Sequence, residues 1–468
     1  MPFGLCNQIA PLVNRRQLLQ YASCGFGWLA FSGMLGRSAG ARGGELLPLE
    51  NPLAAKQPHF AAKAKHVIFL CMRGGPSHLD TFDYKPKLQS DSGKPGPRPG
   101  SKLLASKFKF SKSGKSGLWI SELYSELAKQ ADQLCFIHSM QTDLPAHPQA
   151  LVRLHTGTSQ FVRPSLGAWT LYGLGTENEN LPGFVSITPS SGFGGATNYG
   201  SSFLPAIYQG TALGRDNRPI ATAEIAHLKT RQSREEQRAE LDFLQTLNRR
   251  KLEQDKVNPD VEGAIEAAEL AFKMQSEMPQ VLDLGKETEA TKKLYGLNDR
   301  ATEDFGRKCL LARRMVEAGV RFIEVTHGNW DHHFNMNASL ERSCGEIDRP
   351  VAGLLQDLKK RGLLDETLVV FSGEFGRTPY AQGQDGRDHN NKAFTLWMAG
   401  GGVKGGYAYG KSDPYGFDVE ENPVSIHDLH ATLLALLGLD HERLTFNHAG
   451  RDFRLTDVYG NVVKDVIA

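Results

Sequence analysis

The strongest constraint on the fold is a set of short apolar runs bounded by turn residues. The first run covers residues 67–72 and ends at Gly74-Gly75-Pro76. Short apolar runs of this kind are typical of strands buried on both faces of a parallel sheet. We predict such strands at 67–72, 134–137, 320–325, 368–372 and 394–399.

Amphipathic segments alternate with these runs, and they predict helices over 309–318, 347–361 and 426–437. The alternation predicts an α/β fold with three layers, α/β/α, built on a mostly parallel sheet. A stretch rich in Glu, Lys, Arg and Gln, at about 225–294, predicts a helical insertion of two or three helices. Residues 90–118 are rich in Lys, Gly, Ser and Pro and predict an exposed excursion.

The composition is that of a globular protein. Hydrophobic residues make up 40% of the 468 residues and charged residues 23%, which excludes general disorder. The formal net charge of +2 gives no indication of a nucleic-acid partner, so we expect none. The length allows one large domain or two ordinary ones.

The N-terminus predicts a signal peptide over residues 1–41. Arg15-Arg16 precedes Leu18-Leu19 and an apolar stretch, and a small-residue cleavage site follows at 39–41. The arginine pair indicates the twin-arginine route and hence a location in the periplasm or at the cell surface. A buried N-terminal helix and a retained anchor are the alternatives, although the stretch is short for a span.

The predicted mature chain consists of a linker, 42–62, and one domain, 63–468. It contains no further apolar run long enough to span a membrane. The spacings of its cysteines, Cys71, Cys135, Cys309 and Cys344, match no zinc ribbon or CxxC pattern. Cys71 lies in an apolar run and is predicted to be a small buried hydrophobe. One disulfide among the four cysteines is possible, but the sequence does not identify the pair.

Reactive side chains gather at the ends of the predicted strands, where ligands bind in parallel sheets. Imidazole and carboxylate groups together suit divalent metals, so we predict a Zn, Mn, Fe or Ca site. Its expected ligands are Asp80, Asp331, His333, Glu374, Asp388 and His389. Glu374 is expected either to bind the metal or to hold one of its ligands.

The expected catalytic residues are His147, Arg377, Ser77 and His78. His147 precedes Pro148 at a predicted helix start, where a histidine can bind metal, transfer protons or cap the helix. Arg377 suits bidentate binding of a substrate oxyanion, or else pairing with a structural carboxylate.

Five segments in order resemble the family called domain of unknown function 1501. These are residues 74–83 (GGPSHLDTFD), 163–169 (RPSLGAW), 330–333 (WDHH), 373–379 (GEFGRTP) and 386–389 (GRDH). Members of that family are uncharacterised exported proteins, abundant in planctomycete-type bacteria and often carrying twin-arginine signals. The resemblance covers roughly residues 60–468.

That family in turn is similar to the alkaline phosphatase and sulfatase superfamily. Residues 66–72 resemble its first strand, 147–157 the sulfatase segment from the nucleophile to a Thr-Gly pair, and 425–434 a late helix. The resemblance implies an alkaline-phosphatase-like fold and a metal-dependent hydrolase of phosphate or sulfate esters. A small molecule or a glycan would then carry the ester.

The sequence departs from the superfamily at its reactive positions. His147 stands where the nucleophile Cys, Ser or Thr is expected, Arg73-Gly74-Gly75 replaces the paired aspartates, and Glu374-Phe375 replaces an Asp-His pair. The fold therefore carries over more readily than the mechanism. A catalytically silent surface or scaffold protein with the same fold is the alternative to the hydrolase.

Overall fold

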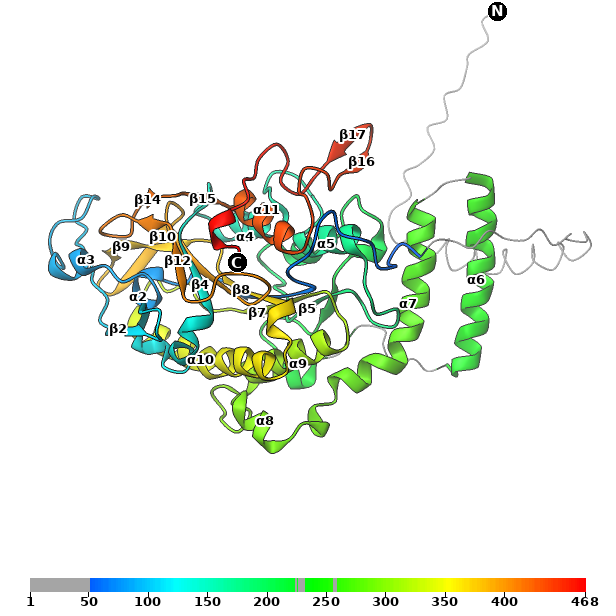
Figure 1. Cartoon of the computed structure of the whole chain (residues 1–468), viewed down its shortest axis with the longest axis horizontal. Helices are drawn as coiled ribbons and strands as arrows, with labels where there is room; N and C mark the ends of the chain where they lie inside the picture. The colour runs from blue at the N-terminus through cyan, green and yellow to red at the C-terminus, as the bar shows by residue number, and fades with distance from the viewer. Residues whose placement is uncertain (1–50, 224, 226–231, 256–258) are drawn as a thin grey trace, which may run out of the picture. The chain divides into compact units, whose positions relative to one another are not determined.

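The computed structural model describes residues 51–223, 225, 232–255 and 259–468 (Figure 1). The predicted signal peptide and residues 42–50 of the predicted linker lie outside these ranges. Residues 51–62 form no helix or strand, yet they are held on the domain. The backbone N–H of Lys56 donates to the Leu174 carbonyl and that of His59 to the Gly438 carbonyl, both at 2.9 Å. Within the described ranges, no helix is long and apolar enough to cross a membrane.

A nine-stranded sheet forms the centre of the domain, in the order β12-β4-β11-β8-β1-β7-β5-β6, with β15 beside β4. Its strands are β1 (His66–Met72), β4 (Leu134–Gln141), β5 (Phe184–Ile187), β6 (Thr211–Leu213), β7 (Phe322–His327), β8 (Thr367–Ser372), β11 (Phe394–Ala399), β12 (Tyr407–Tyr409) and β15 (Val424–Ser425). Every pair is parallel except those of β11, which runs antiparallel to β4 and β8. The prediction of a mostly parallel sheet is confirmed.

Both faces of the sheet are covered, because successive side chains of a strand point to opposite sides. Leu70 of β1 belongs to a core that includes Leu310 and Leu354 on one face, and Phe69 to a core that includes Leu154 and Leu433 on the other. The first core is formed with α9 (Glu303–Glu317) and α10 (Met336–Lys360). The second is formed with α4 (His147–Thr156), α5 (Leu166–Leu174) and α11 (Ile426–Leu436). These helices and the sheet give the three predicted layers (Figure 1).

Helices occupy the stretch predicted as an insertion. They are α6 (Arg234–Asp255), α7 (Pro259–Leu282), a 3-10 turn (Leu284–Lys286) and α8 (Glu289–Leu294). Arg238 on α6 forms an ion pair with Glu269 on α7, at 2.7 Å. Met278 on α7 is fully buried in the core shared with α9.

Several small elements lie outside the central sheet. They are α2 (His78–Thr81), α3 (Pro86–Ser90), β2 (Phe110–Ser113), β3 (Leu118–Ser121), β9 (Gly376–Gln382), β10 (Gly386–Asn390), β13 (Lys411–Ser412), β14 (Val419–Glu421), β16 (Phe446–His448) and β17 (Arg451–Phe453). The antiparallel hairpin of β9 and β10 was not predicted, because its polar sequence lacks apolar alternation.

The strand directions bring distant segments to one edge. Strands β7, β1 and β8 are parallel neighbours, so their carboxyl ends meet there. Because β11 is antiparallel to β8 and β4, its first residue and the carboxyl end of β4 lie at the same edge. The segments after β1, β4, β7 and β8 therefore meet the β9–β10 hairpin, which precedes β11.

Candidate metal centre

Three histidines surround one carboxylate oxygen at this edge. The Nε2 atoms of His147, His333 and His389 lie 3.1, 2.8 and 3.2 Å from Oδ1 of Asp331. His147 opens α4, Asp331 and His333 follow β7, and His389 lies on β10. We call these four residues the histidine cluster; one ligand atom from each lies within 4.8 Å of all the others.

The other ring nitrogen of each histidine meets an oxygen acceptor. His147 Nδ1 is 2.6 Å from Glu374 Oε1, and His389 Nδ1 is 2.6 Å from the Pro145 carbonyl. His333 Nδ1 is 2.5 Å from Gln382 Oε1. If each Nδ1 carries the proton, each Nε2 keeps a lone pair that faces the cluster. Histidines that bind metals are oriented in this way by partners of the ring nitrogen that is not a ligand.

The spacing of the three Nε2 atoms suits metal coordination better than direct contact between the imidazoles. His333 Nε2 and His389 Nε2 are only 2.9 Å apart, and His147 Nε2 is buried 3.1 Å from Asp331 Oδ1. Two lone pairs at that distance repel unless a proton or a cation lies between them. Neighbouring ligands of a tetrahedral zinc ion are roughly 3.3 Å apart, which is close to the spacing observed here.

The electrostatics keep the carboxylate ionised. Burial raises the pKa of Asp331, but hydrogen bonds from His147, His389 and Arg377 outweigh burial and hold that pKa well below its ordinary value. Burial likewise lowers the pKa of His147, but the bonds to Asp331 and Glu374 prevail and raise it to about 9. Without a metal, His147 is therefore protonated at neutral pH.

Arg377 supports the loops around the cluster. Its side chain is 1% exposed and donates to the carbonyls of Gly75 at 2.8 Å, Gly74 at 2.5 Å and Arg387 at 3.1 Å. It also donates to Asp331 Oδ1 at 2.7 Å. Of the two roles expected for Arg377, pairing with a carboxylate is the one that matches these contacts, and that carboxylate is Asp331 of the histidine cluster.

The loop after β7 is fixed by packing and by close backbone approach. Trp330 is fully buried, and its Nε1–H donates to His327 Nδ1 at 2.9 Å. Gly74 has φ +119°, and a Cβ atom there would lie 2.7 Å from the backbone nitrogen of Asp331. A larger residue would therefore push the loop that carries Asp331 away from β1.

Glu374 holds a ligand and is not itself in the cluster. Its carboxylate is fully buried and accepts the backbone N–H groups of Gly74, at 3.0 and 3.1 Å, and of Gly75, at 3.3 Å. The remaining bond, to His147 Nδ1, fixes that imidazole. The second of the two roles expected for Glu374 matches this placement.

Asp388 points away from the cluster, contrary to the expected ligand set. It neighbours His389 on β10, at the point where the register of β10 with β9 shifts. His389 turns to the cluster, whereas Asp388 forms an ion pair with Arg98 at 2.5 Å. The expectation that both residues turn inward fails because the segment is a strand and not a loop.

The catalytic and metal-binding residues that were expected in the segment after β1 form other contacts instead. Asp80 forms a fully buried ion pair with Arg387 at 2.8 Å, and Ser77 donates to Asp80 at 2.5 Å. His78 Nε2 lies 3.0 Å from the Gly416 carbonyl. These three therefore brace the hairpin and the Gly416 loop. The partners Pro145 and Gln382 could not be predicted from local pattern, because neither belongs to a recognisable motif.

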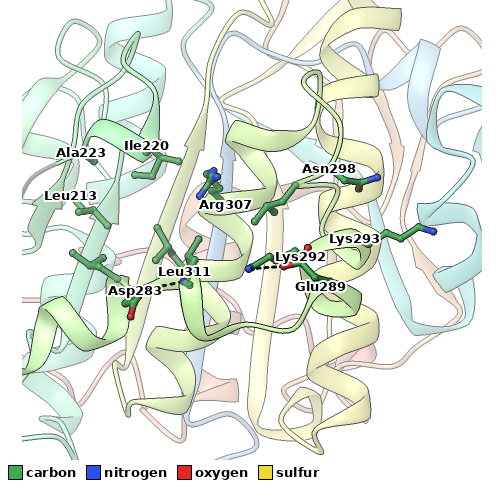
Figure 2. Close-up of a pocket in the computed structure, with 15 residues that line it drawn as sticks. Leu213, Ile220, Ala223, Asp283, Glu289, Lys292, Lys293, Asn298, Arg307 and Leu311 are labelled. Carbon is green, nitrogen blue, oxygen red and sulfur yellow. Dashed lines mark hydrogen bonds and ion pairs between the residues drawn. The ribbon is translucent and has the colours of Figure 1, made fainter.

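Two cavities lie outside the cluster. One, of about 740 Å³, is lined by residues of α9 and the insertion, among them Leu311 and Lys292, which forms an ion pair with Glu289 (Figure 2). The other, of about 810 Å³, is lined by Asp143 and by several arginines that include Arg163. No member of the histidine cluster lines either cavity.

Comparisons with known proteins identify a family but no activity. The sequence model of the family described as "Protein of unknown function (DUF1501)" matches residues 64–467. No curated protein matches this chain.

Solved structures resemble the chain only distantly. A sulfatase, PsFucS1, from Pseudoalteromonas sp. is 12% identical, with 81% of this chain and 68% of that chain covered and a TM-score of 0.34. The alkaline phosphatase of the Antarctic bacterium TAB5 is 10% identical, with 80% and 98% covered and a TM-score of 0.33. The C-terminal periplasmic domain of EcEptC from Escherichia coli, in complex with Zn, is 10% identical, with 90% and 99% covered and a TM-score of 0.34. At these scores, no conclusion about chemistry rests on the similarity.

Proposed function

The chain belongs to the DUF1501 family, whose description states no activity. We propose metal-dependent hydrolysis from the site, and phosphate or sulfate esters as the substrates from the sequence resemblance to the alkaline phosphatase and sulfatase superfamily. The observation that carries the proposal is the convergence of three imidazole Nε2 atoms on Asp331 Oδ1, with every Nδ1 held by an acceptor. A scaffold protein has no need of such an arrangement at a strand-end edge.

The proposed ligands are His147, Asp331, His333 and His389. This set differs from the one expected from the sequence. His147 is now a ligand, and Asp80 and Asp388 are not. Glu374 is the partner that orients His147. Three imidazoles favour Zn²⁺, Mn²⁺ or Fe²⁺ over Ca²⁺, which prefers oxygen ligands.

The cluster is open on one side, as a catalytic site requires. Asp331 has 44% of its side chain exposed, and His333 and His389 have 23% and 19% exposed, while His147 is buried. A catalytic metal site keeps one position for water or substrate, so with four protein ligands the ion would be five-coordinate when water binds.

The residues present favour water as the nucleophile. His147 stands where the resemblance places a nucleophile, but both its ring nitrogens face carboxylates, at 3.1 and 2.6 Å. The Ser77 hydroxyl is bonded to Asp80. When bound, a divalent ion would lower the pKa of water and stabilise the negative charge that develops in ester hydrolysis.

Metal analysis combined with an esterase assay tests the proposal. The purified protein is expected to contain a divalent transition metal and to hydrolyse 4-nitrophenyl phosphate or 4-nitrophenyl sulfate. His333→Ala and His389→Ala should each lose metal and activity together, and His147→Ala should do the same because it is a proposed ligand. His448→Ala, an exposed histidine on β16, is the control and should keep both.

The outcomes separate the two functions expected from the sequence. A wild type that holds no transition metal and hydrolyses neither ester would contradict the hydrolase and favour a scaffold. If His147→Ala keeps the metal but loses turnover, the hydrolase stands and His147 acts on the substrate instead.

Export by the twin-arginine route is also our proposal. Arg15 and Arg16 form an address read by a receptor, so replacing both with Lys should leave the precursor in the cytoplasm. Normal export of that variant, measured by cell fractionation, would contradict the assignment. The substrate would then be a small molecule or a glycan ester available outside the cytoplasm.

A further inference from the structure

A second group of ligand-type side chains lies deeper, between the sheet and α4. Cys71 on β1, His155 on α4 and Glu324 on β7 are 1%, 6% and 3% exposed. We call these three residues the buried trio; one ligand atom from each lies within 4.8 Å of the others. His155 is eight residues after His147 on the same helix, about 12 Å along its axis, so the trio is separate from the histidine cluster.

The trio contains polar atoms that the protein leaves unsatisfied. His155 Nδ1 lies 2.8 Å from the Leu151 carbonyl and donates to it, so a metal would be bound through Nε2. That Nε2 is 3.3 Å from Glu324 Oε1, and it has no hydrogen-bond partner. Glu324 Oε2 is likewise buried without a partner. Buried polar atoms are nearly always paired, and a cation bound between the three side chains would pair these atoms.

We propose that Cys71, His155 and Glu324 bind Zn²⁺ or a similar thiophilic divalent cation. A thiolate, an imidazole and a carboxylate are the three kinds of side chain that bind zinc in proteins. The 3.3 Å between His155 Nε2 and Glu324 Oε1 equals the edge of a tetrahedron with bonds of roughly 2.0 Å.

Charge balance supports a divalent ion at this depth. The Cys71 thiol gives its proton to solvent when the metal binds, and His155 binds as the neutral imidazole. One thiolate and one carboxylate then neutralise the two positive charges of the ion. A neutral, fully coordinated group can be buried in an apolar layer at much lower cost than an isolated charge.

A fourth polar group lies beside the trio. Ser186 on β5 pairs in register with Glu324 on β7, so both side chains leave the same face of the sheet. The Ser186 hydroxyl is buried and has no hydrogen-bond partner. It is placed to bond to a fourth ligand, such as a water molecule.

The location indicates a structural role. The metal would join β1, β7 and α4, the helix whose first residue is His147. Because the trio is buried, the ion would enter as the chain folds, and binding would be coupled to folding. Zinc at the trio would thereby fix α4 on the sheet and hold His147 in place.

Cobalt substitution tests the proposal with a signal that only a thiol ligand gives. The full chain carrying His333→Ala and His389→Ala, which disables the histidine cluster, is folded with Co²⁺ as the sole metal. A thiolate-to-cobalt charge-transfer band in the near ultraviolet is expected. Cys71→Ser should abolish it. Cys135→Ser should retain it, because Cys135 is also buried and free, on β4.

The zinc content of the protein gives an independent measurement. Folded with Zn²⁺, the His333→Ala, His389→Ala protein should hold about one zinc per chain, and adding Glu324→Gln should remove it. A folded cobalt protein without the band overturns the proposal and leaves the trio as a proton-sharing pair beside a thiol. If Cys71→Ser fails to fold, the spectrum of its parent still decides.

Discussion

Glu374→Gln tests whether the partner of His147 controls metal binding. The carboxylate accepts three bonds, two from the backbone of Gly74 and Gly75 and one from His147. A carboxamide has one oxygen and one NH₂ group. If the NH₂ faces His147, the imidazole must accept at Nδ1 and carry its proton on Nε2, which removes the lone pair that a metal needs.

The expected size of this effect follows from the geometry. Loss of a partner that orients a metal ligand typically weakens metal binding 10- to 100-fold, which is about 1.4 to 2.7 kcal/mol. If the NH₂ group instead faces Gly74 and Gly75, its two N–H donors point at the two backbone N–H donors of these glycines in a buried site. The cost then falls on the free energy of unfolding, at about 1–3 kcal/mol.

Competition with a chromophoric chelator measures the affinity, and urea unfolding measures the stability. Asp348→Asn is a matched control, because Asp348 is a buried carboxylate that accepts the backbone N–H groups of Glu126 and Leu127 but faces no histidine. It should lower stability and leave metal affinity unchanged. If Glu374→Gln leaves both the metal affinity and the free energy of unfolding at their wild-type values, the orienting role of Glu374 is refuted.

Three further outcomes are expected. Gly74→Ala should lower the free energy of unfolding by about 1–3 kcal/mol and weaken metal binding, since its Cβ meets the Asp331 backbone at a positive φ; wild-type affinity in a folded variant would contradict this. Asp80→Asn should cost about 3–5 kcal/mol by leaving Arg387 buried without its charge partner, while the metal content of the folded fraction stays unchanged in elemental analysis. Metal binding must displace the proton from His147, whose pKa in the metal-free protein is raised to about 9, so apparent affinity should rise about tenfold per pH unit up to that pH and then level; titrations that show no dependence on pH would refute His147 as a ligand.

The sequence predicted the parts of the site that depend on local pattern. Apolar runs located β1, β8 and β11, and the order of strands and helices placed Asp331, His333 and His389 beside strand ends. The carboxyl ends of parallel strands meet at one edge whatever the loops contain, so the convergence of these side chains could be inferred before the structure was known.

The tertiary structure decided which of the reactive residues turn toward one another. Asp388 and His389 are adjacent in sequence, and only the pairing of β10 with β9 sends one outward and the other inward. Asp80 carries the same group as Asp331, yet it is neutralised by Arg387, 307 residues away along the chain.

The buried trio likewise could not be predicted from the sequence alone. Cys71 was predicted to be a small buried hydrophobe, because its neighbours along β1 are apolar. Only the packing of α4 on the sheet brings His155 to it, and only the register of β1 with β7 adds Glu324. Local sequence determines where a strand or helix forms, because hydrophobic periodicity acts over a few residues. The partners of a polar side chain depend on contacts between distant segments, and those exist only in the folded chain.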